Sequence, residues 1–267
     1  MNKKLTGISE TMLIPLWARA FETDRENPIV NDPKAREMVS RIDYDFKKFQ
    51  KSWLSQLGVA IRTMLLDNAI LTFIRDNQDA WIVNLGAGLD TRYERIGKES
   101  VKCWYDLDVP ESIALRKQFF TESSRNRFVA TSAYDFSWIN EINPAQAILI
   151  VAEGLLMYFS EDENKALFRQ LAEKLSGAQM LFEMMAPAAV GKSRRHDALK
   201  KIDNTPEFKW GIKNSREMES WHHGIQFVQE WNLVDYHKDR WRWPGYIARM
   251  PFIKPRVSQR IVHINFS

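Results

Sequence analysis

Apolar residues recur in two different patterns along the chain of 267 residues. In roughly the first 77 residues they follow helical spacing, in segments 35–42 and 60–74, and Asn27-Pro28 and Asp32-Pro33 interrupt the pattern. No segment there alternates as a strand would. We therefore expect a helical cap over residues 1–78 and a core over residues 79–267, integrated into one domain.

From residue 80 onward, short apolar runs alternate with helical segments. Ser160 and Glu163 have the spacing of a capping box at the start of one helix, and Gly177 ends it. Alternation of this kind predicts a mostly parallel sheet with helices on both faces. The predicted strands are 80–85, 101–107, 127–131, 145–152 and 179–184, and the predicted helices are 110–122 and 160–175.

The last third of the chain departs from this alternation. Residues 186–224 predict an insertion of helices and loops after the fifth strand. Residues 227–234 and 260–266 predict two closing strands, which would form a C-terminal antiparallel hairpin. The expected fold class is therefore α/β, with a seven-stranded, Rossmann-like and mostly parallel sheet.

Composition narrows the classes of partner. The net charge is +4, but 38 Lys and Arg are dispersed among 34 Asp and Glu, which predicts no nucleic-acid partner. A basic excess in 191–201 fits a solvated helix better than a patch for a polar ligand. No apolar run approaches the roughly 18–20 residues of a membrane helix, so we expect no membrane partner. A single cysteine, Cys103, and the lack of an apolar leader predict a cytoplasmic location, and no metal site is expected.

A glycine-rich turn follows the first predicted strand. In parallel sheets, ligands bind beyond the carboxyl ends of the strands, and Gly86 and Gly88 would let the backbone approach one closely. Thr91 stands where a dinucleotide fingerprint has its third glycine, and Asp90 would repel a pyrophosphate. S-adenosylmethionine presents an ammonium and a sulfonium instead. The turn therefore favours this methyl donor as cofactor.

The second predicted strand ends in two acidic residues. Asp106 and Asp108 lie 18 and 20 residues after Gly88, the distance at which a carboxylate accepts hydrogen bonds from ribose hydroxyls. Spacing does not decide between them. One of them could instead cap the helix that begins near Pro110, and Asp108 is placed for that role.

Taken together, these segments resemble the leucine carboxyl methyltransferase family, and within it a bacterial branch that includes polyketide O-methyltransferases of the tetracenomycin type. The resemblance covers nearly the whole chain and implies the fold of a class I S-adenosylmethionine methyltransferase. The segments that carry it are 27–33, 60–63, 83–92, 105–110 and 151–158.

The resemblance also implies roles for residues of the donor site. Arg62 would pair with the methionine carboxylate of the donor, a contact suited to a planar guanidinium; the alternative is a surface arginine on an amphipathic helix. Glu153 would face the amino-acid end of the donor, with a helix cap or a salt bridge as its alternative role. The remaining positions implied are Gly86 and Gly88 at the methionine portion, Asp108 at the ribose and Asp135 at the adenine amino group.

The resemblance and the motifs predict an O-methyltransferase that acts on a carboxylate or hydroxyl of a small molecule such as a polyketide or another secondary metabolite. A protein C-terminal carboxylate is a less favoured acceptor, because the insertion 186–224 does not match the subgroup that uses one. Two other classes remain as alternatives, a donor-binding protein without catalysis and an NAD(P)-dependent oxidoreductase. The sequence does not indicate the oligomeric state.

No motif identifies a catalytic base. A phenol acceptor would benefit from one, whereas a carboxylate acceptor is already ionised at pH 7. The C-terminal tryptophans prompt a further hypothesis, that some of them line a pocket for an aromatic acceptor; packing in the core is the alternative for most. The candidate bases are Tyr158, His196, His222, His223 and His237, and the tryptophans are Trp210, Trp221, Trp231, Trp241 and Trp243.

Overall fold

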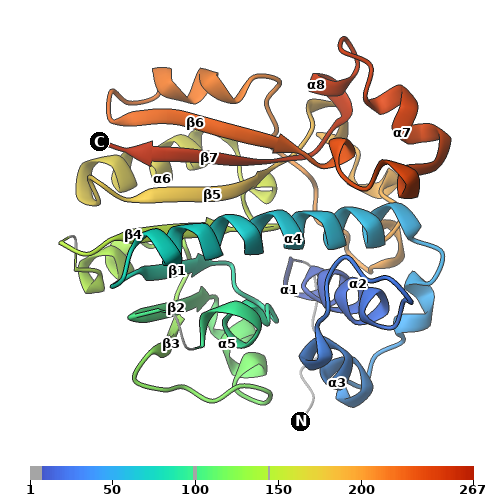
Figure 1. Ribbon diagram of the computed structural model, residues 1–267, viewed down its shortest axis with the longest axis horizontal. Helices are drawn as coiled ribbons and strands as arrows, with labels where there is room; N and C mark the ends of the chain where they lie inside the picture. The colour runs from blue at the N-terminus through green and yellow to red at the C-terminus, as the bar shows by residue number, and fades with distance from the viewer. Residues whose placement is uncertain (1–7, 99–100, 144) are drawn as a thin grey trace.

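A computed structural model describes residues 8–98, 101–143 and 145–267, and its strands form a single seven-stranded sheet (Figure 1). The strand order is β3-β2-β1-β4-β5-β7-β6. The strands are β1 (Trp81–Leu85), β2 (Cys103–Asp108), β3 (Asn126–Ala130), β4 (Ile148–Ala152), β5 (Gln179–Met184), β6 (Ile225–Asn232) and β7 (Arg260–Phe266).

The first five strands pair in parallel, and β7 lies antiparallel between β5 and β6. The carboxyl ends of the parallel strands therefore meet at one edge of the sheet, where the strand order reverses between β1 and β4. This arrangement confirms the predicted fold class, including the antiparallel pair at the C-terminus.

Side chains that alternate along the strands divide the core into two layers. From β1, Ile82 points to the face covered by α4 (Trp53–Asp76), whereas Val83 points to the face covered by α6 (Glu161–Lys174). Ser160 caps α6 and forms the predicted capping box with Glu163. Because both faces are covered, the central strands β1 and β4 are almost entirely apolar and buried, as is typical of parallel sheets.

A third apolar cluster lies beyond the carboxyl edge of the sheet. It joins α2 (Leu13–Thr23) and α3 (Pro33–Arg41) to residues of the segment that follows β5, among them Leu199 and Phe208. That segment contains four short 3-10 helices, η5 (Pro187–Ala189), η6 (Ser193–Arg195), η7 (Leu199–Lys201) and η8 (Ser215–Ser220). The remaining N-terminal elements are α1 (Ile8–Thr11) and η1 (Phe46–Phe49).

One predicted helix is shorter than expected. Residues 110–122 were expected to be helical, but α5 spans Pro110–Arg116. The amides of Phe119 and Phe120 both turn back to the carbonyl of Arg116, which closes the helix. The Phe120 ring then packs over the Arg116 guanidinium, 4.3 Å from the ring centroid. Tertiary packing around one buried arginine thus ends the helix before its sequence pattern does.

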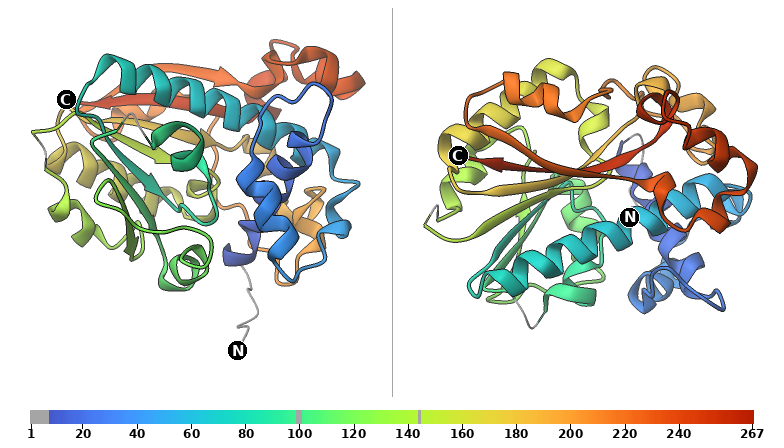
Figure 2. Two further views of the ribbon diagram at one scale, coloured as in Figure 1. Left: turned by 60° about the horizontal axis from the view of Figure 1, so that its bottom comes forward. Right: turned by 45° about the horizontal axis from the view of Figure 1, so that its top comes forward.

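A helical segment between the last two strands was not anticipated. Residues 233–259, which we call the β6–β7 connection, lie beyond the same end of the sheet as the N-terminal helices (Figure 2). Its elements are η9 (Leu233–Asp235), η10 (Lys238–Trp241), α7 (Arg242–Ala248) and α8 (Lys254–Val257).

Helix α4 also differs from the sequence analysis, because it is long and apolar enough to cross a membrane by length and composition. Two thirds of its most apolar stretch, 67%, is buried inside the protein. It packs across one face of the sheet, so the structure gives it the role of a core helix.

Candidate functional site

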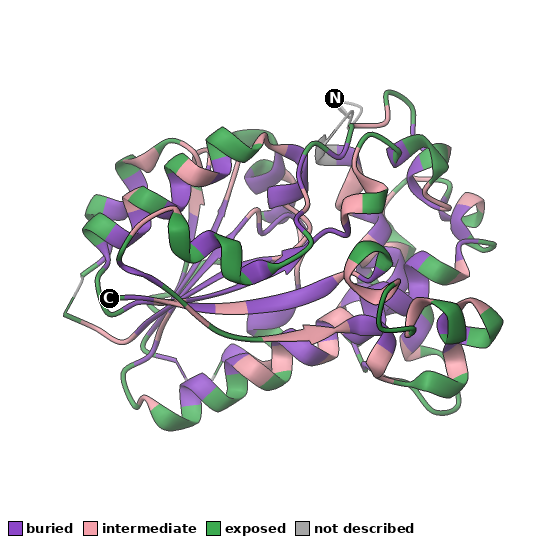
Figure 3. Cartoon of the chain, turned by 90° about the horizontal axis from the view of Figure 1, so that it is seen from above, coloured by how far each residue is buried: buried purple, intermediate pink, exposed green. Residues whose placement is uncertain are grey.

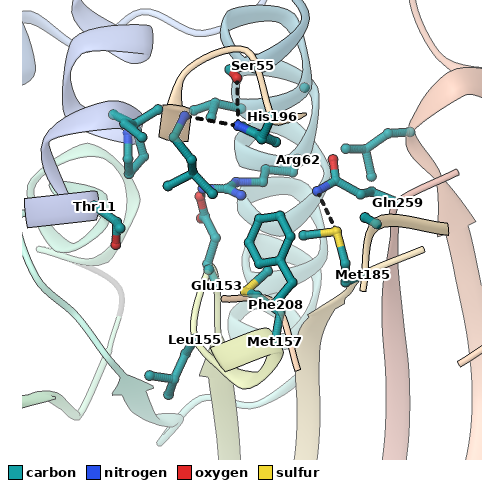
Figure 4. Close-up of a pocket in the computed structure, with 18 of the residues that line it drawn as sticks. Thr11, Ser55, Arg62, Glu153, Leu155, Met157, Met185, His196, Phe208 and Gln259 are labelled. Atoms are coloured by element: carbon teal, nitrogen blue, oxygen red, sulfur yellow. Dashed lines mark hydrogen bonds and ion pairs between the residues drawn. The ribbon is translucent and has the colours of Figure 1, made fainter. Parts of the chain in front are cut away.

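A cavity of about 850 Å³ lies at the carboxyl edge of the sheet. The turn after β1 and the ends of β2 and β4 form its floor, and α2, α4, the segment after β5 and the β6–β7 connection form its walls. In the close-up of Figure 4, Arg62 on α4 and Glu153 after β4 point toward each other, with His196 and Phe208 nearby. Of the eight predicted donor-site residues, the lining includes six: Arg62, Gly86, Gly88, Asp90, Asp108 and Glu153.

The turn after β1 depends on its two glycines. Both have positive φ, +66° at Gly86 and +44° at Gly88. A Cβ at Gly86 would lie 2.9 Å from Leu155 Cδ1, and one at Gly88 would lie 3.1 Å from Met12 Cβ. The backbone amide of Gly88 donates to Asp108 Oδ2 at 2.7 Å, which ties this turn to the end of β2. Any residue other than glycine at these two positions would therefore place its Cβ in the space where the turn meets its neighbours.

The structure separates the two acidic residues of β2. Asp106 is buried beneath the cavity and pairs with Arg116 at 2.6 Å, while the side chains of Asn84 and Trp104 also donate to it. Asp108 lies at the cavity wall, and burial raises its pKa although the amides of Gly88 and Val109 act in the opposite direction. Only Asp108 is positioned to meet a ligand in the cavity.

Arg62 is held by two carboxylates at once. Its Nε donates to Glu153 at 2.7 Å, and its Nη1 donates to Glu183 at 2.7 Å. Glu183 also accepts the amide of Gly154 at 3.0 Å and is buried. Sequence reasoning missed Glu183, although a signal was present, because it interrupts the apolar strand 179–184 as Glu153 closes 145–152.

A buried network of charges extends from this pair under the cavity floor. Arg92 bridges Glu153 at 2.6 Å, Asp67 at 2.7 Å and also Asp90. Arg95 continues it to Asp32 at 3.1 Å, where Arg19 joins at 2.9 Å. In all, the network contains four arginines (Arg19, Arg62, Arg92, Arg95) and five carboxylates (Asp32, Asp67, Asp90, Glu153, Glu183).

With all members ionised, the network carries one negative charge in excess. Burial disfavours the ionised carboxyls, but Arg92 and Arg95 hold the pKa of Asp90 below its usual range, and Arg62 and Arg92 do the same for Glu153. These groups are therefore carboxylates at neutral pH. The excess negative charge suits a ligand with a net positive charge.

The structure places several predicted residues away from the cavity. Asp135 is exposed, and its carboxylate caps η3 (Phe136–Glu141) by accepting the Ser137 amide at 3.2 Å. His222 and His223 stack together in the turn before β6, with ring centroids 4.2 Å apart. His237 is exposed and contacts Met64. None of these four contributes to the described cavity lining, so the geometry supports neither their catalytic nor their donor-binding roles.

Tyr158 and His196 do line the cavity. Burial raises the pKa of Tyr158 to about 12, although a hydrogen bond with Thr11 acts in the opposite direction, so the phenol stays protonated at neutral pH. Burial lowers the pKa of His196, and its ring is therefore neutral. The Leu199 amide donates to His196 Nδ1 at 3.3 Å, so the proton of the neutral ring is assigned to Nε2. Both side chains are thus hydrogen-bond donors.

The tryptophans divide between the core and the cavity. Trp210 and Trp221 pack against Phe168 in the core, and Trp231 stacks on His263. Only Trp241 and Trp243 line the cavity, and both belong to the β6–β7 connection.

Comparison with known families matches residues 12–172, more than half of the chain, to the leucine carboxyl methyltransferase model. The chain belongs to this family. It is therefore a methyltransferase, and not the oxidoreductase that the sequence analysis kept as an alternative. The matched residues include every predicted donor-site position, from Arg62 to Glu153, and end before the segments that follow β5 and β6.

Two curated relatives extend the similarity over most of the chain. A tetracenomycin polyketide synthesis O-methyltransferase, TcmP, from Streptomyces glaucescens is 31% identical over 87% of this chain and 85% of its own length. The S-adenosyl-L-methionine-dependent methyltransferase dpfgK from Gibberella zeae is 28% identical over 92% of this chain and 90% of its own.

Solved structures with the same fold have little sequence identity. A DUF574 family protein from Streptomyces avermitilis has a TM-score of 0.57 at 10% identity, covering 96% of this chain and 97% of its own. An S-adenosylmethionine-dependent methyltransferase from Anabaena variabilis has a TM-score of 0.51 at 10% identity, covering 83% and 94%. At these identities the likeness concerns the fold alone.

Proposed function

We propose that this chain is an O-methyltransferase that methylates the carboxylate of an apolar small molecule, such as a polyketide-like secondary metabolite. The observation that carries the proposal is the hydrogen bond from the Leu199 amide to His196 Nδ1, which leaves Nε2 of the neutral ring as a donor. A phenol acceptor would benefit from a base, whereas His196 is held as a donor and burial raises the pKa of Tyr158 to about 12, so that its phenol keeps its proton. A carboxylate acceptor needs no base and accepts hydrogen bonds from such groups.

S-adenosylmethionine is the methyl donor, and it supplies an electrophilic methyl group when bound. The residues of the cavity fit it. We propose that Gly86 and Gly88 contact its methionine portion, Asp108 accepts hydrogen bonds from the ribose hydroxyls, and Glu153 and Asp90 face its ammonium. Arg62 would offer its guanidinium to the carboxylate; its bonds to Glu153 and Glu183 use Nε and Nη1.

The acceptor would occupy the part of the cavity formed by the C-terminal segments. Met185, Phe208, Trp241 and Trp243 line it there, which favours an apolar and partly aromatic molecule. The similarity to TcmP, whose name states polyketide synthesis and O-methylation, supports the same class of acceptor.

The experiment measures S-adenosylhomocysteine release with an aromatic acid that carries both a carboxyl and a phenol group. A methyl ester is hydrolysed by mild alkali, whereas a methyl ether survives it, so the product identifies the methylated oxygen. We expect the ester. An ether would shift the proposal to a hydroxyl acceptor. A peptide ending in leucine serves as the second substrate, and preferential turnover of that peptide would favour a protein C-terminus instead.

A further inference from the structure

The β6–β7 connection gathers apolar side chains on the protein surface. Among the described residues, ten large hydrophobic side chains are exposed, and six of them lie within residues 243–257. The most exposed are Phe252 at 84%, Trp243 at 72% and Tyr246 at 69%. Figure 3 colours most of this segment as exposed or intermediate. Isolated exposed hydrophobic residues are ordinary, but a contiguous group marks a binding surface.

The same segment accounts for the net positive charge of the chain. Residues 233–259 contain four arginines and two lysines against two aspartates, a net +4, which equals the formal net charge of the whole protein. Two of these basic side chains are neutralised by ion pairs, since Arg240 binds Glu22 and Lys254 binds Asp235. The surface is therefore both apolar and basic, while the rest of the chain is neutral on balance.

The cavity reaches the surface at this segment. Trp243, Ile247 and Val257 line the cavity and are themselves exposed, as is Leu54 on the opposite wall. Arg242 lies beside this opening, with its guanidinium 4.9 Å from the centroid of the Trp53 ring. A molecule that approaches the basic and apolar surface thus reaches the entrance of the cavity.

We propose that the β6–β7 connection docks on anionic lipid bilayers. A bilayer interface matches both components at once: apolar side chains enter the acyl boundary, Trp and Tyr lie at the level of the headgroups, and Lys and Arg bind the anionic headgroups. A second copy of the chain fits less well, because it would bring two surfaces of net positive charge together. Docking would place the cavity entrance against the layer in which apolar acceptors dissolve.

Co-sedimentation with vesicles tests this proposal without any turnover, so it is independent of the acceptor. The full chain is mixed with vesicles of phosphatidylcholine alone or of phosphatidylcholine with phosphatidylserine. We expect sedimentation with the anionic vesicles, weakened by added salt because the headgroup contacts are screened. The pair Tyr246→Ser and Phe252→Ser should reduce partitioning at least ~10-fold, since two exposed rings no longer enter the lipid.

Charge is tested separately. Lys238→Gln with Arg256→Gln should weaken binding to anionic vesicles by roughly 5-fold for each residue. Leu71→Ser and Lys102→Gln are matched controls, since Leu71 is 42% exposed and Lys102 62% exposed on other elements, and both should bind as the unmodified chain does. Failure of the unmodified chain to sediment with anionic vesicles would overturn the proposal. A dimer in light scattering that Phe252→Ser dissociates would overturn it in favour of a second copy.

Discussion

Two aspartates of one strand, Asp106 and Asp108, contribute differently to the stability of the fold. Burial raises the pKa of both, so the ionised form of each is disfavoured in the folded chain, but the half-buried Asp108 has no ion-pair partner among the described residues. Asp106 neutralises the buried Arg116. The spacing in the sequence does not distinguish the two residues, whereas the structure assigns Asp108 to the ligand cavity and Asp106 to the stability of the fold.

We predict that Asp108→Asn changes the free energy of unfolding at pH 7 by no more than about 1 kcal/mol, because the relief of a buried charge is offset by the loss of one of the two backbone amides that the carboxylate accepts. The same change should weaken donor binding about 10-fold or more, because a charged hydrogen-bond acceptor is lost. Urea unfolding and calorimetric titration with S-adenosylmethionine measure the two effects.

Asp106→Asn is the matched control, expected to destabilise the fold by about 3–5 kcal/mol because Arg116 is left buried without its carboxylate. Reversed stability effects of the two variants would show that the assignment of roles within β2 is wrong.

His196 allows a second prediction at this scale. If it donates through Nε2, Gln can replace it, so His196→Gln should keep kcat/KM within about 10-fold, whereas His196→Ala should lose a further ~10-fold, the range for one hydrogen bond. Because burial lowers its pKa below the ordinary 6.5, a base at this position would make kcat/KM rise between about pH 5 and pH 7, and we expect no such rise from a donor. Loss of activity in both variants together with such a rise would identify His196 as a base.

At the scale of elements, the β6–β7 connection supplies the side chains that we assign to acceptor recognition. Trp243 and Tyr246 are one helical turn apart in α7 and similarly exposed, but only Trp243 lines the cavity. Trp243→Ala should raise the KM of an aromatic acceptor about 10-fold through lost ring contacts and leave donor affinity unchanged. Tyr246→Ala should change neither in a vesicle-free assay. Equal effects of the two substitutions on KM would contradict the assignment.

The elements were predictable where local pattern and tertiary packing agree. Strands β5 and β7 have their predicted bounds, because their apolar runs are bounded by turns and buried on both faces. The β6–β7 connection was missed because most of its large apolar residues, those within 243–257, are exposed and follow no core-facing period. The same contrast holds in the site. Gly86 and Gly88 belong to a local motif, whereas the partners of Arg62 lie 91 and 121 residues away in sequence.

At the scale of the whole molecule, the buried network links the cap to the core through charge. Asp32, Asp90 and Glu153 have pKa values below their ordinary 3.8, 3.8 and 4.5, since their arginine partners outweigh burial. A carboxyl with a lowered folded pKa stabilises the fold above its unfolded value and loses that contribution as the pH falls through its folded value. Asp106 and Asp108, whose pKa values are raised, act in the opposite direction.

Because more of the shifted carboxyls are lowered than raised, we expect the free energy of unfolding to fall by on the order of 2–3 kcal/mol between pH 7 and about pH 3.5. Urea unfolding at several pH values measures this dependence. Asp32→Asn should lower stability at pH 7, because Arg19 and Arg95 lose a shared partner, and should make the dependence shallower. A flat profile in the unmodified chain would show that the network does not couple to folding.

The order of the segments along the chain has a consequence for divergence within the family. The residues assigned to the donor precede residue 172, within the region matched by the family model, whereas the tryptophans assigned to the acceptor come from the connection that follows β6. Mutations in that connection alter the entrance of the cavity and leave the donor-site residues in place, namely the glycine turn, Arg62 and Glu153. New acceptors can therefore be acquired by replacing one C-terminal segment, on a donor site inherited intact.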